Sequence, residues 1–125
     1  MAKCLSLRQP YAELIVSGRK TIELRKWNTK FRGEFLIHAS QTIDKQACKS
    51  YNIDTSSLIT GAIVGAAVLY DVKIYQNKQE FIADKGKHFA HNYQDPKYGF
   101  LLSDVKRFDK PISLKGKLGF FNASL

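Results

Sequence analysis

Cysteine is scarce in this sequence, which has only Cys4 and Cys48 in a chain of 125 residues. The two form no CxxC pair, and no histidine stands at the spacing of a zinc site. A disulfide-rich scaffold is therefore excluded, and no metal site is predicted. We expect two buried, reduced thiols, with a disulfide or a metal ligand as the alternatives.

Long apolar runs are also missing. No segment reaches the roughly 18 residues that a membrane-spanning helix needs. The first ten residues, MAKCLSLRQP, contain neither the apolar segment nor the small-residue cleavage site of a signal peptide. We therefore expect no membrane partner and a cytoplasmic location.

Proline and glycine do not gather into a linker, because the 3 prolines and 8 glycines are scattered along the chain. There is no internal repeat and no low-complexity tract. With 44% hydrophobic and 12% aromatic residues, the chain can bury a core. We expect a single domain over residues 1–125.

Common catalytic and cofactor motifs are absent as well. The sequence has no Walker loop, no GxGxxG, no GxSxG and no Ser-His-Asp pattern. Nucleotide hydrolysis, hydride transfer and triad hydrolysis are therefore unsupported, and no cofactor is expected. Among the histidines, His38 is expected to be a hydrogen-bonded structural group. His88 and His91 are expected in a loop, where they contact a polyanion.

Positive charge is what the chain has in excess, with 20 Lys and Arg against 11 Asp and Glu and a net charge of +9. The first 38 residues alone hold eight basic and three acidic side chains, so the excess is densest there. Such a distribution is typical of a protein that binds polyanions. The alternative is a basic surface that serves solubility.

Alternating apolar and polar residues predict a chain dominated by strands, with a few short helices. The strand expected at residues 61–75 is predicted to bend at Gly65 or near Tyr70, because a flat strand of that length would be longer than a small domain is wide. Residues 85–97 are expected to form a polar loop. Strands are expected at residues 3–8, 21–27, 34–40, 61–75, 98–109 and 112–124, and helices at 10–18, 44–52 and 78–84.

The most charged stretch is SGRKTIELRKW, which places four basic residues around Glu23 and ends in the only tryptophan, Trp27. In an extended strand Glu23, Arg25 and Trp27 share one face, whereas Ile22 and Leu24 face the core. Arg25 can hold a phosphate or a base edge, and Trp27 can stack on a base. The alternative is a solvated ion pair beside a packed tryptophan.

Lys20 stands at the turn between the first helix and this strand, and we expect it at the rim of a cleft. There it is either a solvated side chain or a phosphate contact. It becomes a base or nucleophile only if burial or a neighbouring cation lowers its pKa. Arg8 and Gln9 precede the helix and can hold a phosphate or read a base edge, or they are plain loop residues.

Two stretches, SLRQPYAELIVSGRKTIELRKW and RGEFLIHAS, resemble the ASCH domain (activating-signal-cointegrator homology). TGAIVGAAVLYDV and YGFLLSDVKRFDKPISLKGKLGFF resemble its central and closing strands, so the likeness covers nearly the whole chain. The resemblance implies an α+β, PUA-like fold. It consists of a small mixed β-barrel of five to six strands with two to three short helices. It also implies a cleft between the barrel and the first helix, with RNA, single-stranded nucleic acid or a modified nucleoside as the ligand class.

The polar residues that match the family motifs are expected in the cleft. One branch of the superfamily comprises amidohydrolases of acetylated cytidine, in which the lysine of this motif is catalytic. Lys20 matches that lysine, but Glu23 stands where the branch has threonine. Phe100 stands where relatives often have tryptophan, and a phenyl ring can fill the same core space. The matching positions are Gln9, Pro10, Lys20, Glu23, Arg25 and Ser103.

The leading hypothesis is a module that binds nucleic acid, with RNA as the expected partner. Cationic side chains attract phosphates, polar ones contact the ligand in the cleft, and Trp27 or Tyr11 stacks. The alternative is a hydrolase of ribonuclease or acetylcytidine amidohydrolase type, with Lys20 and Glu23 as the catalytic pair. A third hypothesis is a protein-interaction module, and the oligomeric state is left open. The expected binding residues are Ser6, Arg8, Gln9, Tyr11, Lys20, Glu23, Arg25, Trp27 and Arg32.

Overall fold

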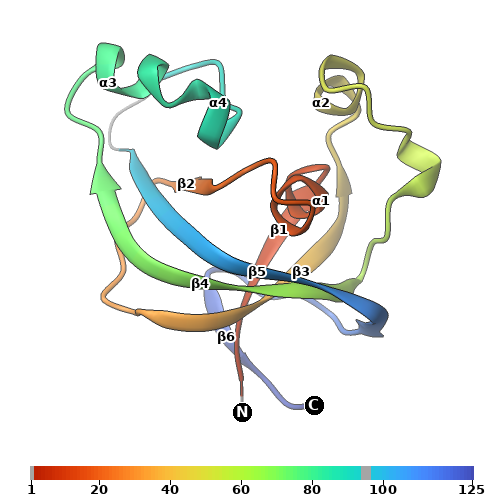
Figure 1. Cartoon of the computed structure of the whole chain (residues 1–125). Coiled ribbons are helices and arrows are strands. Elements are labelled where there is room, and N and C mark those ends of the chain that lie inside the picture. The colour runs from red at the N-terminus through yellow and green to blue at the C-terminus, as the bar shows by residue number, and fades with distance from the viewer. Residues whose placement is uncertain (1, 94–96) are drawn as a thin grey trace.

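The computed structural model describes residues 2–93 and 97–125 and shows one strongly curved sheet with short helices beside it (Figure 1). The strands lie in the order β2-β5-β4-β3-β1-β6. They are β1 (Ala2–Gln9), β2 (Ile22–Arg25), β3 (Gly33–Ile43), β4 (Ala62–Ile74), β5 (Tyr98–Ser113) and β6 (Phe120–Ala123). The helices are α1 (Tyr11–Val16), α2 (Lys45–Ser50), the 3₁₀ helix η1 (Thr55–Ser57), α3 (Lys78–Ala83) and α4 (Lys85–His88).

The sheet is mixed, as expected, but it is not a closed barrel. β1 and β3 run parallel, whereas the other neighbouring strands run antiparallel. The two edge strands, β2 and β6, have four residues each, and no ladder joins them within the described residues. The α+β class is confirmed, and the expected barrel is in fact an open, curved sheet.

The longest strands, β4 and β5, give the sheet its curvature. Their pairing shifts register at three places, Ile63/Gly65, Ala66/Val68 and Leu69/Asp71, and the first and last are the regions where a bend was expected. At Gly65 a Cβ atom would lie 2.2 Å from the backbone oxygen of Lys106, so only glycine allows this close approach.

β5 is continuous over residues where two separate strands were expected. Pro111 lies inside it, and Ile112 and Ser113 still pair with β4. Because β2 pairs with only the first residues of β5, the opposite side of the strand is free near Pro111. A proline without an N–H group is tolerated at such an unpaired edge.

Local sequence explains where the short helices begin and end. The Asp44 side chain accepts a hydrogen bond from the backbone N–H of Ala47 and caps α2, and Asn77 caps α3 in the same way. α1 ends just before Gly18, whose φ of 85° is the left-handed conformation that favours glycine. α1 packs against β1, β3, β4 and β5 and so covers the concave side of the sheet (Figure 1).

Aromatic rings fill the core beneath the first helix. Phe100 is fully buried and stacks on Phe120, so the phenyl ring does occupy core space. Trp27 lies past the end of β2 and meets the rings of Phe100 and Phe120 edge-on. Cys4 and Cys48 are both free and buried, in agreement with the expected thiols.

The segment expected as a loop at residues 85–97 begins instead with α4. His88 ends this helix and is buried, with one ring nitrogen 2.7 Å from the carbonyl oxygen of Phe81. The expectation that His88 is a loop residue in contact with a polyanion is therefore wrong, because it belongs to α4 and its ring is buried and hydrogen-bonded. Residues 94–96 lie outside the described residues. None of the described helices has the length and apolar character needed to cross a membrane.

Candidate functional site

Lys20 is buried, not a solvated residue at a cleft rim. Its backbone N–H donates to the carbonyl of Leu14, which folds the chain back against α1. Only 3% of the residue is exposed. Its Nζ donates to the carbonyl oxygen of His88 at 2.6 Å and lies 3.4 Å from Oε1 of Glu23. The helix α4, which was not expected, supplies the carbonyl that covers this lysine.

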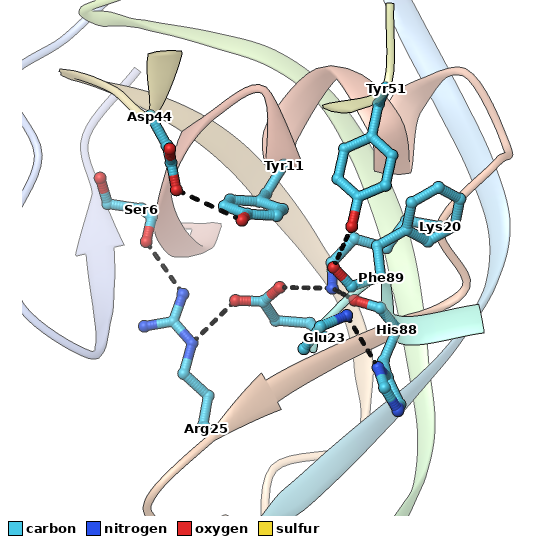
Figure 2. A network of polar contacts seen from close by, with 10 residues as sticks. Ser6, Tyr11, Lys20, Glu23, Arg25, Asp44, Tyr51, His88 and Phe89 are labelled. Atoms are coloured by element: carbon cyan, nitrogen blue, oxygen red, sulfur yellow. Dashed lines mark hydrogen bonds and ion pairs between the residues drawn. The ribbon is translucent and has the colours of Figure 1, made fainter. Parts of the chain in front are cut away.

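Glu23 lies between two cations. Its Oε1 faces Lys20, and its Oε2 accepts a hydrogen bond from Nε of Arg25 at 3.1 Å. Arg25 in turn donates from Nη2 to the backbone oxygen of Ser6 at 3.0 Å. These contacts form a continuous series, which we call the polar network. It runs from the His88 carbonyl through Lys20, Glu23 and Arg25 to Ser6 (Figure 2).

Burial controls the electrostatics of this network. Loss of solvation lowers the pKa of Lys20, and the Glu23 carboxylate opposes this effect by stabilising the ammonium form. The guanidinium of Arg25 lowers the pKa of Lys20 further. The two cations and one carboxylate leave the network with positive charge when Lys20 is protonated.

Tyr11, the first residue of α1, lies beside the network. Nζ of Lys20 and the guanidinium of Arg8 lie 5.6 and 5.8 Å from the centre of its ring. Its hydroxyl is 3.5 Å from the Asp44 carboxylate (Figure 2). Burial and Asp44 raise the pKa of Tyr11. Asp44 was missed as a site residue, because the sequence shows it only as a helix cap.

The segment that follows α3 is attached to the site through its backbone oxygens. Besides the bond from Lys20, the N–H of Thr21 donates to the Lys87 oxygen at 3.0 Å. The hydroxyl of Tyr51 donates to the Phe89 oxygen at 2.6 Å. His91 lies outside helices and strands, as expected; it is exposed and stacks on Tyr51.

A pocket of about 380 Å³ opens beside Glu23 and Arg25, and we call it the first pocket. Six of the nine expected binding residues line it, although they come from β1, α1 and the β2 region. Lys26 and Lys97 also line it and were not expected. Loss of solvation and the nearby Lys26 lower the pKa of Lys97. The lining residues are Ser6, Leu7, Arg8, Tyr11, Glu23, Leu24, Arg25, Lys26, Trp27 and Lys97.

Two expected binding residues have structural roles elsewhere. Gln9 is buried, and its side chain accepts from the N–H of Glu13 and donates to the carbonyl of Ile59. Arg32 bonds the carbonyls of its own turn and lies 3.6 Å from Asp71. Neither lines the first pocket, so a role of Gln9 or Arg32 in binding stays a prediction.

The alternation expected for β2 holds only in part. Ile22 is buried as expected, but Leu24 is only partly buried and lines the first pocket. Trp27 lines the pocket too, while its ring edge belongs to the core and the guanidinium of Arg25 lies over it at 5.8 Å. The rings of Tyr11 and Trp27 therefore both line the first pocket, and each has a cationic side chain over it.

The comparison with protein families finds that the ASCH domain matches residues 5–112 of the chain. The chain belongs to the ASCH family. This family generally has a PUA-like RNA-binding fold. Ser103 of this ASCH domain lies on β5, where its hydroxyl donates to the Asp104 carboxylate. It does not line the first pocket, so its cleft role stays a prediction.

Solved structures of ASCH proteins from Zymomonas mobilis share the fold of this ASCH domain. The protein itself and a serine-to-alanine mutant align with TM-scores of 0.66, and a tyrosine-to-phenylalanine mutant aligns with 0.65. Each of the three is 20% identical to this chain. Each alignment covers 90% of this chain and, in the same order, 73%, 73% and 75% of the Zymomonas mobilis chain. At this identity the likeness concerns the fold alone. A comparison with curated proteins finds no match.

Proposed function

We propose that this ASCH domain binds single-stranded or modified RNA in the first pocket. The observation that carries the proposal is the charge of a pocket of about 380 Å³. Four cationic side chains line it beside one carboxylate, Glu23. This volume falls in the range of roughly 300–1,000 Å³ that is typical of small-ligand sites. A single nucleotide is therefore the unit that suits it.

The available charges favour a phosphate. Arg8, Lys26 and Lys97 form no ion pair with any carboxylate in the described parts of the chain, so they are free to contact an anion. Arg25 is held by Glu23 and Ser6 and defines the wall of the pocket. The ring of Tyr11 offers a stacking surface for the base.

Salt-dependent binding tests the proposal. Fluorescence anisotropy with a labelled single-stranded RNA, repeated over a range of salt concentrations, gives the affinity and the salt slope. The double variant R8Q/K26Q is expected to weaken binding and to reduce the slope by about 0.7 for each lost phosphate contact. The control K78Q/K110Q removes the same charge from exposed positions outside the pocket and should affect the slope less. Absence of RNA binding at low salt would disprove the proposal.

A second candidate function is supported by the burial of Lys20. Its pKa is lowered, which is the shift that a lysine base or nucleophile needs. With Glu23 as the partner, the chain would act as a hydrolase on RNA or on acetylated cytidine. Incubation of the protein with each substrate tests this function. Turnover that is lost in Lys20→Gln would establish the enzyme, and no turnover of either substrate would leave the binding function alone.

A further inference from the structure

A second pocket, of about 620 Å³, shares Ser6 with the first. Its walls come from β1, β3 and the segment between β5 and β6. Ser6 therefore separates two cavities, since Arg25 holds its carbonyl oxygen while its side chain faces His38. Nothing in the proposed function uses the second pocket, although it is the larger of the two.

Hydrogen bonds fix the wall between the pockets. Nε2 of His38 lies 2.5 Å from the carbonyl oxygen of Leu114, so this nitrogen carries the proton and donates. Nδ1 forms the other hydrogen bond of the ring, with the hydroxyl of Ser6 at 2.9 Å. These contacts connect β1 and β3 to the chain after β5 and give the second pocket a wall with a defined position.

Two lysines line this pocket and have no ion-pair partner among the described residues. Lys115 and Lys117 are exposed, and neither forms an ion pair with a carboxylate of the described chain. Beside them are the apolar side chains of Leu114 and Leu118, and Leu118 is 98% exposed. An apolar surface next to free cations suits a planar ring that carries a phosphate.

We propose that the second pocket binds the neighbouring nucleotide of the RNA strand that occupies the first pocket. Lys115 and Lys117 contact the phosphate of that nucleotide, and its base lies against Leu114 and Leu118. Ser6 lies at the point where the strand passes from one pocket to the other. The inference rests on the proposed function and adds that the recognised unit is at least a dinucleotide.

Gly116 offers an independent way to change the second pocket. A Cβ atom there would lie 2.8 Å from both Cε1 of His38 and Oγ of Ser6. Gly116→Ala therefore requires a shift either of the segment between β5 and β6 or of the His38 and Ser6 side chains in the shared wall. The first pocket lacks Gly116 in its lining, so its shape depends less on this residue.

NMR titration of the labelled protein tests the inference. The probes are the four nucleoside 5′-monophosphates and the corresponding homodinucleotides. Monophosphates are expected to shift amide signals of the first pocket, such as those of Arg8 and Glu23. Dinucleotides are expected to shift those of Gly61 and Gly116 as well and to bind more tightly. The gain in affinity is expected to disappear in K115Q/K117Q and in Gly116→Ala, whereas K78Q/K110Q keeps it.

The outcomes separate this inference from the proposed function. If mononucleotides and dinucleotides bind equally and Gly61 and Gly116 do not respond, the second pocket is not a nucleotide site, while the first pocket still is. If K115Q/K117Q leaves the salt slope for a hexanucleotide unchanged, instead of reducing it by about 0.7 per lysine, the inference is likewise overturned. If no nucleotide of any length binds, both proposals fail.

Discussion

The ammonium group of Lys20 donates a hydrogen bond of 2.6 Å to the carbonyl oxygen of His88, a residue 68 positions later in the chain. This contact joins the start of β2 to the end of α4 and removes Lys20 from solvent. Since Glu23 lies 3.4 Å away on the other side, one lysine connects a backbone oxygen to a carboxylate. Several properties of the domain depend on this arrangement.

Replacing Lys20 with methionine should destabilise the fold. The change leaves Glu23, a residue that is 8% exposed, with Arg25 as its one ion-pair partner among the described residues. We expect a loss of about 3 kcal/mol in the free energy of unfolding, as for other buried pairs that lose one member. Urea unfolding at neutral pH measures it.

A double variant gives the control for this loss. If the loss of stability in K20M comes from a Glu23 carboxylate that has lost its lysine, the double variant K20M/E23Q should be more stable than K20M alone. Hydrogen exchange should also quicken at residues 87–89 in both variants, because the bond to the His88 oxygen is gone. Equal stability of the single and double variants would contradict the explanation.

Tyr11 should contribute to RNA affinity through its ring and not through its hydroxyl. Removing a stacking ring costs about 1–3 kcal/mol per base, so Tyr11→Ala should weaken binding roughly tenfold or more. Tyr11→Phe keeps the ring and should retain most of the affinity. Tyr70→Ala removes a tyrosine that is 55% exposed and outside both pockets, so it serves as the control. Equal losses in the alanine and phenylalanine variants would argue against stacking.

Gly65 should tolerate no side chain. A Cβ atom at 2.2 Å from the Lys106 oxygen and 2.8 Å from Val16 requires a shift of β4, β5 or α1. We expect Gly65→Ala to lower the unfolding free energy by about 3 kcal/mol, at the upper end of the usual cost of overpacking. The matched control is Gly86→Ala in α4, where no atom lies within 4 Å of the added carbon. A neutral Gly65→Ala in thermal unfolding would show that the strands separate easily.

Cys4 should make stability depend on pH in the alkaline range. Burial raises the pKa of its thiol from 9.0 to about 11. Between these values the unfolded chain releases the proton and the folded chain keeps it. The stabilisation that the buried, protonated thiol gives the folded state is therefore complete below pH 9 and is lost as pH rises toward 11. The difference in unfolding free energy between wild type and Cys4→Ala should shrink over this window, whereas a constant difference would contradict the shift.

Local patterns in the sequence were sufficient for most of the secondary structure. Alternation located β1 and β3, and the expected helices at residues 10–18 and 44–52 contain α1 and α2. The alternating pattern did not predict that the sheet stays open. Closure into a barrel depends on whether the edge strands β2 and β6 pair with each other, and a local pattern does not show this. The pattern also predicted a separate strand after Pro111. That proline is tolerated inside β5 because β2 does not pair with this part of β5, and local sequence does not show where β2 ends its pairing.

The site could be predicted where its members are close in sequence. Lys20, Glu23 and Arg25 lie within six residues, and they do form one network. Lys97 and His88 join the site from segments more than sixty residues away, and no local pattern marks either as a member. The burial of Lys20 could not be predicted, because it is produced by the carbonyl of a helix that the polar sequence of residues 85–97 did not indicate.

The attachment of α4 to the site has a consequence for how the domain can vary. Thr21, Lys20 and Tyr51 contact the backbone oxygens of Lys87, His88 and Phe89, and every amino acid carries such an oxygen. The identity of the residues at 87–89 therefore contributes nothing to these three bonds. A library of substitutions at positions 87 and 89 could change the side chains beside Lys20 while the three backbone bonds that cover it stay in place.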